Sequence, residues 1–214
     1  MRETNKVKRF FDKRVNKFDS IYDTKKKLVW KVLDFIFRKS VERRFELTCR
    51  ELDNIRNKKI LDIGCGTGRY SVTLAQKGAF VYGIDFSQEM LNTATGFSKD
   101  KGADNLCVFI YGDFIDYNFN DKFDICLAIG FFDYIKEPIE YLKKIKNLTI
   151  ERAILSFPAK WHLRNIIRRL RLKILDCPVY FYSRLDLEKI LKQSGFDEFS
   201  IRNIGRDYFV IVKI

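Results

Sequence analysis

Residues 60–70 read ILDIGCGTGRY, and this stretch decides the fold of the chain. A short apolar run ends in three glycines at alternate positions, and an amphipathic segment follows them. Such apolar runs are typical of buried strands, and glycines let the backbone turn sharply against a ligand that a Cβ atom would exclude. The stretch therefore predicts a strand, a ligand-binding loop and a helix.

The glycine spacing distinguishes this loop from two common nucleotide-binding loops. The glycines follow the pattern GxGxG, whereas a dinucleotide-binding loop needs a glycine at position 69, where Arg69 stands. A P-loop needs a lysine and then a serine or threonine after its last glycine, and Arg69-Tyr70 does not supply them. Binding of a nicotinamide dinucleotide and binding of a nucleoside triphosphate are both disfavoured.

Three acidic residues mark the ends of three successive predicted strands. Asp62, two residues before the first glycine, puts a negative charge near the loop, which suits a cationic ligand that carries a sulfonium and an ammonium group. Asp85, 23 residues further on, is placed to accept hydrogen bonds from both ribose hydroxyls, with Phe86 beside it to cover an adenine. Asp113 is placed to accept a hydrogen bond from the adenine amino group.

The runs LDIGCGTG, GIDFS, GDF and FDICLAIGFFDYI resemble those of the class I S-adenosylmethionine-dependent methyltransferases. The resemblance is continuous over about Lys59–Phe157, and the last helix and hairpin extend it to the C-terminus. It implies S-adenosylmethionine as the cofactor, with Asp62 and the glycines around its methionine part. It also implies Asp85 on the ribose, and Asp113 with Phe114 at the adenine. The predicted cofactor-binding residues are Asp62, Gly64, Cys65, Gly66, Gly68, Asp85, Phe86, Asp113, Phe114 and Ile129.

Short apolar runs alternate with amphipathic segments after Lys59, which is typical of a mainly parallel sheet connected by helices. The expected strands are Lys59–Ile63, Phe80–Ile84, Leu106–Tyr111, Phe123–Ile129, Arg152–Phe157, Phe199–Ile204 and Tyr208–Val212. The expected helices are Arg69–Gln76, Gln88–Lys99, Pro138–Ile145 and Leu185–Ser194. The last two strands suggest an antiparallel hairpin. The resemblance implies an α/β fold, a Rossmann-like three-layer sandwich whose mostly parallel seven-stranded sheet has an antiparallel C-terminal strand.

We expect a single methyltransferase domain over residues 1–214. Residues 1–58 are its helical N-terminal extension, residues 59–158 its cofactor-binding core, and residues 159–214 a basic insertion, the last helix and the C-terminal hairpin. Within the extension, Lys25–Asp53 has apolar residues at helical spacing with basic residues between them, which predicts a helix in one or two pieces.

The net charge of +13 is unevenly distributed. Residues 1–58 carry 18 basic and 9 acidic side chains, and residues 159–214 carry 12 basic and 6 acidic ones. Residues 59–158, in contrast, carry 11 basic and 13 acidic side chains. Positive charge on both flanks favours an anionic acceptor or surface, although a solvated basic face explains it equally well. No apolar run approaches the roughly 20 residues that cross a bilayer, and the polar N-terminus does not resemble a secretory signal, so we expect a cytoplasmic protein.

The cysteines and the histidine argue against a transition-metal site. The five cysteines are widely scattered, which fits neither a closed disulfide framework nor a paired zinc motif, so we interpret them as reduced thiols. With His162 as the only histidine, a transition-metal site would depend almost wholly on carboxylates. We therefore expect no metal.

Candidate catalytic residues follow the fourth and fifth predicted strands. Methyl transfer needs an acceptor atom aligned behind the sulfonium methyl, and a general base becomes useful when the acceptor is a hydroxyl. Asp133 and Tyr134, in the run GFFDY, are the first candidates, and neutral His162 is a third. The alternatives are that Asp133 caps the next helix, that the two phenylalanines of the run fill the core, and that His162 is a surface residue without a catalytic role.

We expect transfer of a methyl group from S-adenosylmethionine to a small, anionic or lipid-linked acceptor, at oxygen. The runs GFFDY and SFP, which precede the basic insertion, distantly resemble small-molecule O-methyltransferases, including those that act on magnesium-porphyrin and quinone precursors. In the insertion, Arg164, Arg168 and Arg171 share one side of a predicted amphipathic helix. That helix could be a lid over the acceptor, a peripheral contact with an acidic membrane, or a solvated face.

Two other functions stay open. RNA methylation is favoured by the basic flanks, but no RNA-binding module is recognisable. The run GFFDY also differs from the Asn-Pro-Pro-Tyr-like run of relatives that methylate bases. The second alternative is a regulator that binds S-adenosylmethionine without catalysis.

Overall fold

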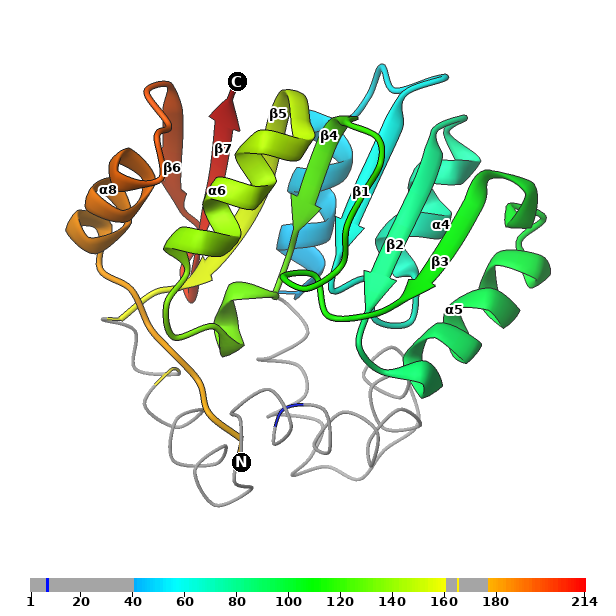
Figure 1. The fold of residues 1–214 in the computed structure, drawn as a ribbon, viewed down its shortest axis with the longest axis horizontal. Coiled ribbons are helices and arrows are strands. Elements are labelled where there is room, and N and C mark those ends of the chain that lie inside the picture. Colours follow the sequence, from blue (N-terminus) through cyan, green and yellow to red (C-terminus); the bar gives the residue numbers. More distant parts are fainter. Residues whose placement is uncertain (1–6, 8–40, 161–164, 166–176) are drawn as a thin grey trace.

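The computed structural model describes residues 7, 41–160, 165 and 177–214. Among these residues, seven strands form one sheet in the order β3-β2-β1-β4-β5-β7-β6 (Figure 1). The strands are β1 (Lys59–Ile63), β2 (Phe80–Asp85), β3 (Cys107–Tyr111), β4 (Phe123–Ala128), β5 (Thr149–Pro158), β6 (Phe199–Asn203) and β7 (Asp207–Lys213). Neighbouring strands pair in parallel except that β7 is antiparallel to both β5 and β6. The predicted sheet, mostly parallel with an antiparallel final strand, is confirmed.

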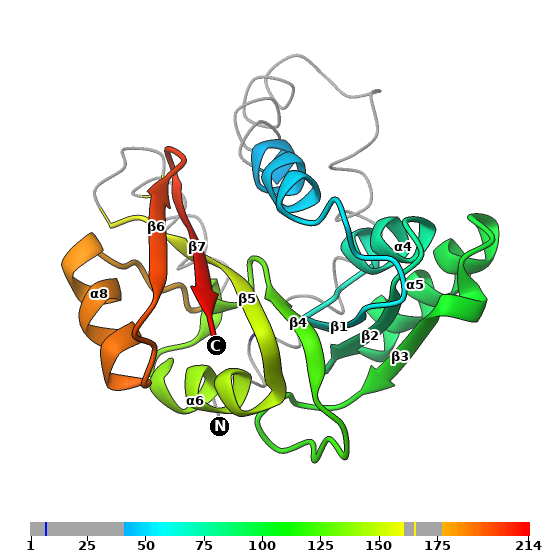
Figure 2. The ribbon, with the colours of Figure 1, turned by 90° about the horizontal axis from the view of Figure 1, so that it is seen from above.

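Helices cover both faces of this sheet (Figure 2). The described helices are α4 (Arg69–Gln76), α5 (Gln88–Asp100), α6 (Ile139–Leu148), α8 (Arg184–Gln193), a helix over residues 41–51, and the 3-10 turns η1 (Asp104–Leu106) and η2 (Phe132–Tyr134). The helix over residues 41–51, α4 and α5 lie on one side, and α6 and α8 lie on the other. The three-layer sandwich expected from the sequence is therefore the observed architecture.

Alternate residues of β1 enter two different cores. Leu61 and Ile63 join a cluster that includes Leu142 of α6 and Leu187 of α8. Ile60 points to the opposite face, where it joins a cluster with Val72 of α4. Because side chains alternate across a strand, a strand covered by helices on both faces is apolar nearly throughout. The single acid in β1 is therefore a departure that needs a structural reason.

The predicted bounds agree with the structure to within about two residues, apart from β5 and α6. β5 begins at Thr149 rather than at Arg152, because Thr149 pairs with Phe123 at the start of β4. The neighbouring strand, and not the apolar pattern, sets this start. α6 continues to Leu148, three residues beyond its predicted end.

Parts of the sequence-based predictions lie outside the described residues. The helix predicted over Lys25–Asp53 is described only from residue 41, and residues 41–51 are helical. The basic helix predicted after residue 162, with its three arginines, is described only at Asn165. The proposed boundaries of the extension, the core and the insertion therefore stay predictions. No described helix has the length and apolar character needed to span a membrane.

Candidate functional site

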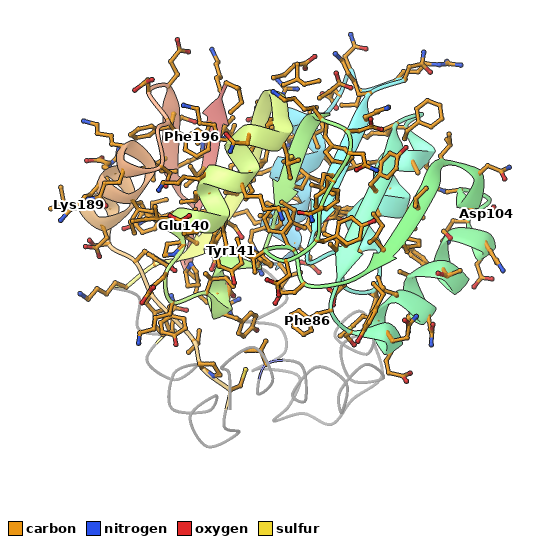
Figure 3. All side chains as sticks on the ribbon, viewed as in Figure 1. Phe86, Asp104, Glu140, Tyr141, Lys189 and Phe196 are labelled. Carbon is orange, nitrogen blue, oxygen red and sulfur yellow. The ribbon has the colours of Figure 1, made fainter. Side chains whose placement is uncertain are left out.

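The carboxyl ends of β1 to β4 lie along one edge of the sheet, the lower edge in Figure 1. Parallel pairing aligns Asp62 with Gly83, and Asp85 with Tyr111, so the segments that follow these strands start close together. Phe86, which follows β2 directly, lies at this edge and is half-buried (Figure 3). Open α/β sheets bind their ligands outside this edge.

Glycine is needed at the three positions of this loop for different structural reasons. All three have left-handed backbones, with φ values of 68°, 54° and 78° for Gly64, Gly66 and Gly68. A Cβ atom on Gly64 would lie 2.9 Å from the ring of Phe131, and one on Gly68 would lie 2.9 Å from Ala94 Cβ. A Cβ atom on Gly66 would meet no described atom within 4 Å. Two glycines therefore allow close packing, and among the described residues the loop has an open side at Gly66.

The Asp85 carboxylate connects this loop to the end of β2. Its Oδ2 accepts a hydrogen bond from the Gly66 amide at 2.9 Å, and its Oδ1 accepts one from the Ser87 amide at 2.9 Å. Ser87 in turn caps α5 by accepting a hydrogen bond from the Met90 amide. Hydrogen bonds to a carboxylate are stronger than neutral ones, and each carboxylate oxygen can accept more than one. These bonds hold the carboxylate in one orientation at the ligand-binding edge.

Asp62 is buried and bonds to a residue of α4. It is 2% exposed, and its Oδ2 accepts a hydrogen bond of 2.6 Å from the Ser71 hydroxyl of α4. Burial raises the pKa of the Asp62 carboxyl from 3.8 to about 6, the charge of Asp85 raises it further, and the Ser71 hydrogen bond opposes both effects. The acid in β1 therefore joins the strand to α4.

The raised pKa of Asp62 predicts how stability depends on pH. The native state holds this proton more tightly than the unfolded state, so the contribution to stability is present below about pH 4 and is lost as pH rises through about 6. The substitution Asp62→Asn removes the titrating group and keeps an acceptor for Ser71. We expect the change that it causes in the free energy of unfolding to be more stabilising at pH 8 than at pH 4, by about 1–3 kcal/mol. Denaturant unfolding at the two pH values measures this, and parallel pH profiles for the parent and the variant would contradict it.

Asp113 organises the turn that follows β3. Its Oδ1 accepts a hydrogen bond from the Ile115 amide at 3.2 Å, and its carbonyl accepts one from the Tyr117 amide at 2.9 Å. The next side chain, Phe114, is 3% exposed and packs against Phe131 with their ring centroids 6.2 Å apart. Phe114 is therefore a core residue by its side chain, so it would meet an adenine through its backbone.

Two further predicted cofactor residues, Cys65 and Ile129, pack their side chains against the protein interior. Cys65 is buried, and its Sγ lies 2.8 Å from the position that a Cβ atom on Gly83 of β2 would take. Burial raises the pKa of the Cys65 thiol well above its usual value. Ile129 is half-buried and packs against the core on the α4 side. The Cys65 thiol is therefore enclosed in the protein, and the Ile129 side chain is partly so.

The candidate catalytic run after β4 forms η2 and is packed against the segment before α8. Asp133 is 2% exposed, and its carbonyl accepts a hydrogen bond from the Tyr180 amide at 2.9 Å. The Tyr182 hydroxyl donates to the Ile135 carbonyl at 2.7 Å, and burial, with the charge of Asp133, raises the pKa of Tyr182. Tyr134 is half-buried. The structure thus brings Asp133 together with two tyrosines, and His162 lies outside the described residues.

Two alternatives for this run are now decided. Asp133 does not cap the next helix, because α6 begins after Pro138 without a side-chain cap. Phe132 is fully buried and stacks on Phe157 with a centroid distance of 4.5 Å, which confirms that it fills the core. Phe131 is half-buried against Gly64 and so shapes the glycine loop.

The sequence did not single out a polar network that supports this run. The buried Ser156 hydroxyl of β5 accepts hydrogen bonds from the Gly130 amide at 2.7 Å and from Arg44 Nη1 at 3.5 Å. Arg44, in the helix over residues 41–51, also forms a buried ion pair of 3.7 Å with Asp207 of β7. Arg44 and Ser156 are 112 positions apart, so no local pattern could have revealed their contact. The network connects the N-terminal extension to the start of the run GFFDY.

Comparison with known proteins gives the family. Residues 55–173, more than half of the chain, match the family model described as Methyltransferase domain. The chain is 29% identical over 151 residues to the magnesium-protoporphyrin O-methyltransferase of Synechocystis sp., covering 67% of this chain and 64% of that protein. It is 25% identical over 118 residues to the ubiquinone biosynthesis O-methyltransferase of Histophilus somni, covering 53% of this chain and 50% of that protein. The chain thus spans between half and two thirds of the length of these relatives.

Solved structures support the same fold. The crystal structure of magnesium protoporphyrin IX methyltransferase from Synechocystis with bound SAH matches with a TM-score of 0.76 and 23% identity, over 99% of this chain and 98% of that chain. A possible histamine N-methyltransferase from Thermotoga maritima matches with a TM-score of 0.70 and 16% identity, over 97% of this chain and 99% of that chain. The chain belongs to the methyltransferase domain family, which confirms the resemblance to class I S-adenosylmethionine-dependent methyltransferases that its motifs predicted.

Proposed function

We propose that this protein transfers a methyl group from S-adenosylmethionine to an oxygen atom of a small, anionic or lipid-linked molecule. The observation that carries the proposal is the bond between the Gly66 amide and the Asp85 carboxylate, next to the open side of the loop. This bond holds a strong hydrogen-bond acceptor beside a part of the loop where no described atom lies within 4 Å of the Gly66 Cβ position. Membership of the methyltransferase domain family supports the reaction type.

We assign the cofactor to the edge formed by the segments after β1, β2 and β3. The methionine part lies against the glycine loop, where the buried charge of Asp62 favours its sulfonium and ammonium groups. The ribose hydroxyls donate to Asp85, Phe86 covers the adenine, and Asp113 accepts a hydrogen bond from its amino group. Two crystal structures of the Synechocystis magnesium protoporphyrin IX methyltransferase, to which this chain is similar, support this cofactor, since one holds SAH and the other SAM.

The acceptor site lies beyond the sulfonium, next to η2. In the reaction the acceptor oxygen attacks the methyl carbon, the carbon–sulfur bond breaks, and the hydroxyl proton passes to a base. Asp133 and Tyr134 are the described candidates for that base, and half-buried Tyr134 is the more accessible of the two. Transfer to oxygen is supported by the names of the two O-methyltransferases to which the chain is similar.

Replacing Asp133 tests its assignment as the base. We expect Asp133→Asn to lower the rate of methyl transfer by roughly 100-fold or more, because a positioned base typically contributes about that much. Affinity for S-adenosylmethionine should stay nearly constant, because Asp133 lies outside the proposed cofactor contacts. The measurement is single-turnover transfer of a labelled methyl group, with the exposed Asp104 changed to Asn as the control.

The choice of acceptors in that assay tests the proposed function itself. Small carboxylated and phenolic compounds, lipid extracts and RNA should be offered in parallel. We expect the label to enter the small compounds or the lipids, and not the RNA. Label in RNA alone would overturn the small-molecule assignment. Cofactor binding without transfer to any acceptor would favour a regulator that binds the cofactor without catalysis. An unchanged rate for the Asp133 variant would remove this residue from the catalytic list.

A further inference from the structure

Lys144 of α6 reaches the turn that follows β3, 27 residues earlier in the chain. Its ammonium group donates hydrogen bonds to the Ile115 carbonyl at 2.9 Å and to the Tyr117 carbonyl at 2.6 Å. The same ammonium lies over the ring of Phe114, 5.3 Å from its centroid, and over that of Phe119 at 5.9 Å. One lysine therefore contacts two carbonyls and two rings of a single turn.

This turn carries Asp113, which we assign to the adenine. Asp113 holds the start of the turn through its bonds to the amides of Ile115 and Tyr117, and Lys144 holds the carbonyls of the same two residues. Each of these residues is thus fixed at both its N–H and its C=O group. Buried Phe114 anchors the middle of the turn in the core. The orientation of Asp113 therefore depends on α6.

The charge of Lys144 also acts on the turn. Burial lowers the pKa of the Lys144 ammonium, while the carboxylates of Asp116 and Asp113 raise it. Lys144 therefore places a positive charge close to the Asp113 carboxylate. An ionised carboxylate accepts a hydrogen bond from an amino group more strongly than a neutral acceptor does.

Neighbouring residues on α6 show that this contact is specific to Lys144. Lys143 is exposed and pairs with Glu140 on the same helix, at 2.9 Å. Tyr141, one turn before Lys144, packs its ring on Phe114 at a centroid distance of 6.4 Å; Glu140 and Tyr141 are labelled on α6 in Figure 3. The helix therefore offers a lysine that touches the turn and an adjacent lysine that does not.

We propose that Lys144 is a positioning residue that sets the preference of this site for a 6-aminopurine. The inference rests on the proposed function, because it assumes that Asp113 accepts a hydrogen bond from the adenine amino group. Lys144 fixes the Asp113 turn through its bonds to the Ile115 and Tyr117 carbonyls. Without it, the turn loses the two bonds that close its carbonyl end, and the carboxylate no longer distinguishes an amino group from an oxygen at position 6.

The test compares two ligands that differ at position 6 of the purine. Calorimetry measures S-adenosylhomocysteine and S-inosylhomocysteine, which carries an oxygen in place of the amino group. We expect the parent protein to prefer the adenine compound, and Lys144→Met to lower that affinity by about tenfold while the inosine compound changes by less than about threefold. Lys144→Arg should restore most of the preference, because it keeps the charge and the donors. The control Lys143→Met should match the parent.

Several outcomes would overturn the inference. An equal loss for both ligands would mean that Lys144 only stabilises the fold, and unchanged affinities would mean that the contact has no role in binding. Where Lys144→Met does not fold, Lys144→Gln is measured in the same way, with the same criterion. If the parent protein binds neither ligand, the proposed function fails as well. If the parent binds and the Lys144 variants keep the same preference for the adenine compound, only the role of Lys144 is refuted.

Discussion

Replacing Asp85 with alanine is expected to weaken S-adenosylmethionine binding by about 100-fold or more while the fold is retained. Charge-assisted hydrogen bonds are worth about 1.5–3 kcal/mol each, and the proposed contact with the ribose would lose two of them. The variant also removes the acceptor for the Gly66 and Ser87 amides, so the glycine loop loses one of its hydrogen bonds to β2 and keeps those from the Gly64 and Cys65 amides to the Ile84 carbonyl. Isothermal calorimetry with S-adenosylmethionine measures the change.

A matched control is available for this variant. Asp104 is exposed at the opposite end of β3, where Figure 3 places it away from the ligand-binding edge. Asp104→Ala should leave cofactor affinity unchanged. If folded Asp85→Ala binds S-adenosylmethionine as tightly as the parent, the ribose assignment of Asp85 is wrong.

Alanine substitutions at Gly66 and Gly68 are expected to separate binding from stability. Gly66→Ala adds a Cβ atom where no described atom lies within 4 Å, so it should lower stability by only about 1 kcal/mol through its left-handed backbone. The same Cβ atom would occupy the open side of the loop, and we expect cofactor affinity to fall by more than about 100-fold. The effect on binding should therefore exceed the effect on folding.

Gly68→Ala should do the reverse. Its Cβ atom would lie 2.9 Å from Ala94 Cβ and 3.3 Å from Ala94 Cα, so α5 would have to move away from the loop. We expect a loss of about 2–4 kcal/mol in the free energy of unfolding, from overpacking together with the left-handed backbone. Denaturant unfolding and calorimetry on both variants measure the two effects. If Gly66→Ala unfolds more readily than Gly68→Ala, the roles assigned to the two glycines are reversed.

Local sequence patterns determined the fold class and the family of this protein. The alternation of short apolar runs with amphipathic segments depends on neighbouring residues, so it revealed β1, α4, β2 and α5 to within a residue at each end. The spacing of three glycines with Asp85 23 residues after Asp62 is also a local feature. The ligand-binding edge then follows from the fold, because parallel strands connected by helices bring their carboxyl ends to one edge.

The tertiary structure alone decided how the acids at that edge are used. The sequence could not tell that Asp62 bonds to Ser71 beneath the loop, since its position before the glycines also fits a residue facing the ligand. It could not tell that Asp133 leaves α6 uncapped, since a helix follows it in either case. Periodicity indicates which face of an element is buried, but the partner of a buried polar group is selected by elements packed from elsewhere in the chain.

The same reason explains why the supporting residues had no signal in the sequence. Lys144 is one of three lysines in KKIK, and only the packing of α6 brings this one to the Ile115 and Tyr117 carbonyls. Arg44 reaches Ser156 only because the helix over residues 41–51 lies near the end of β5. Local sequence patterns determined where the strands and the glycine loop form. Long-range packing decided which side chains hold the loop segments in place, because those contacts exist only once the sheet and its helices have assembled.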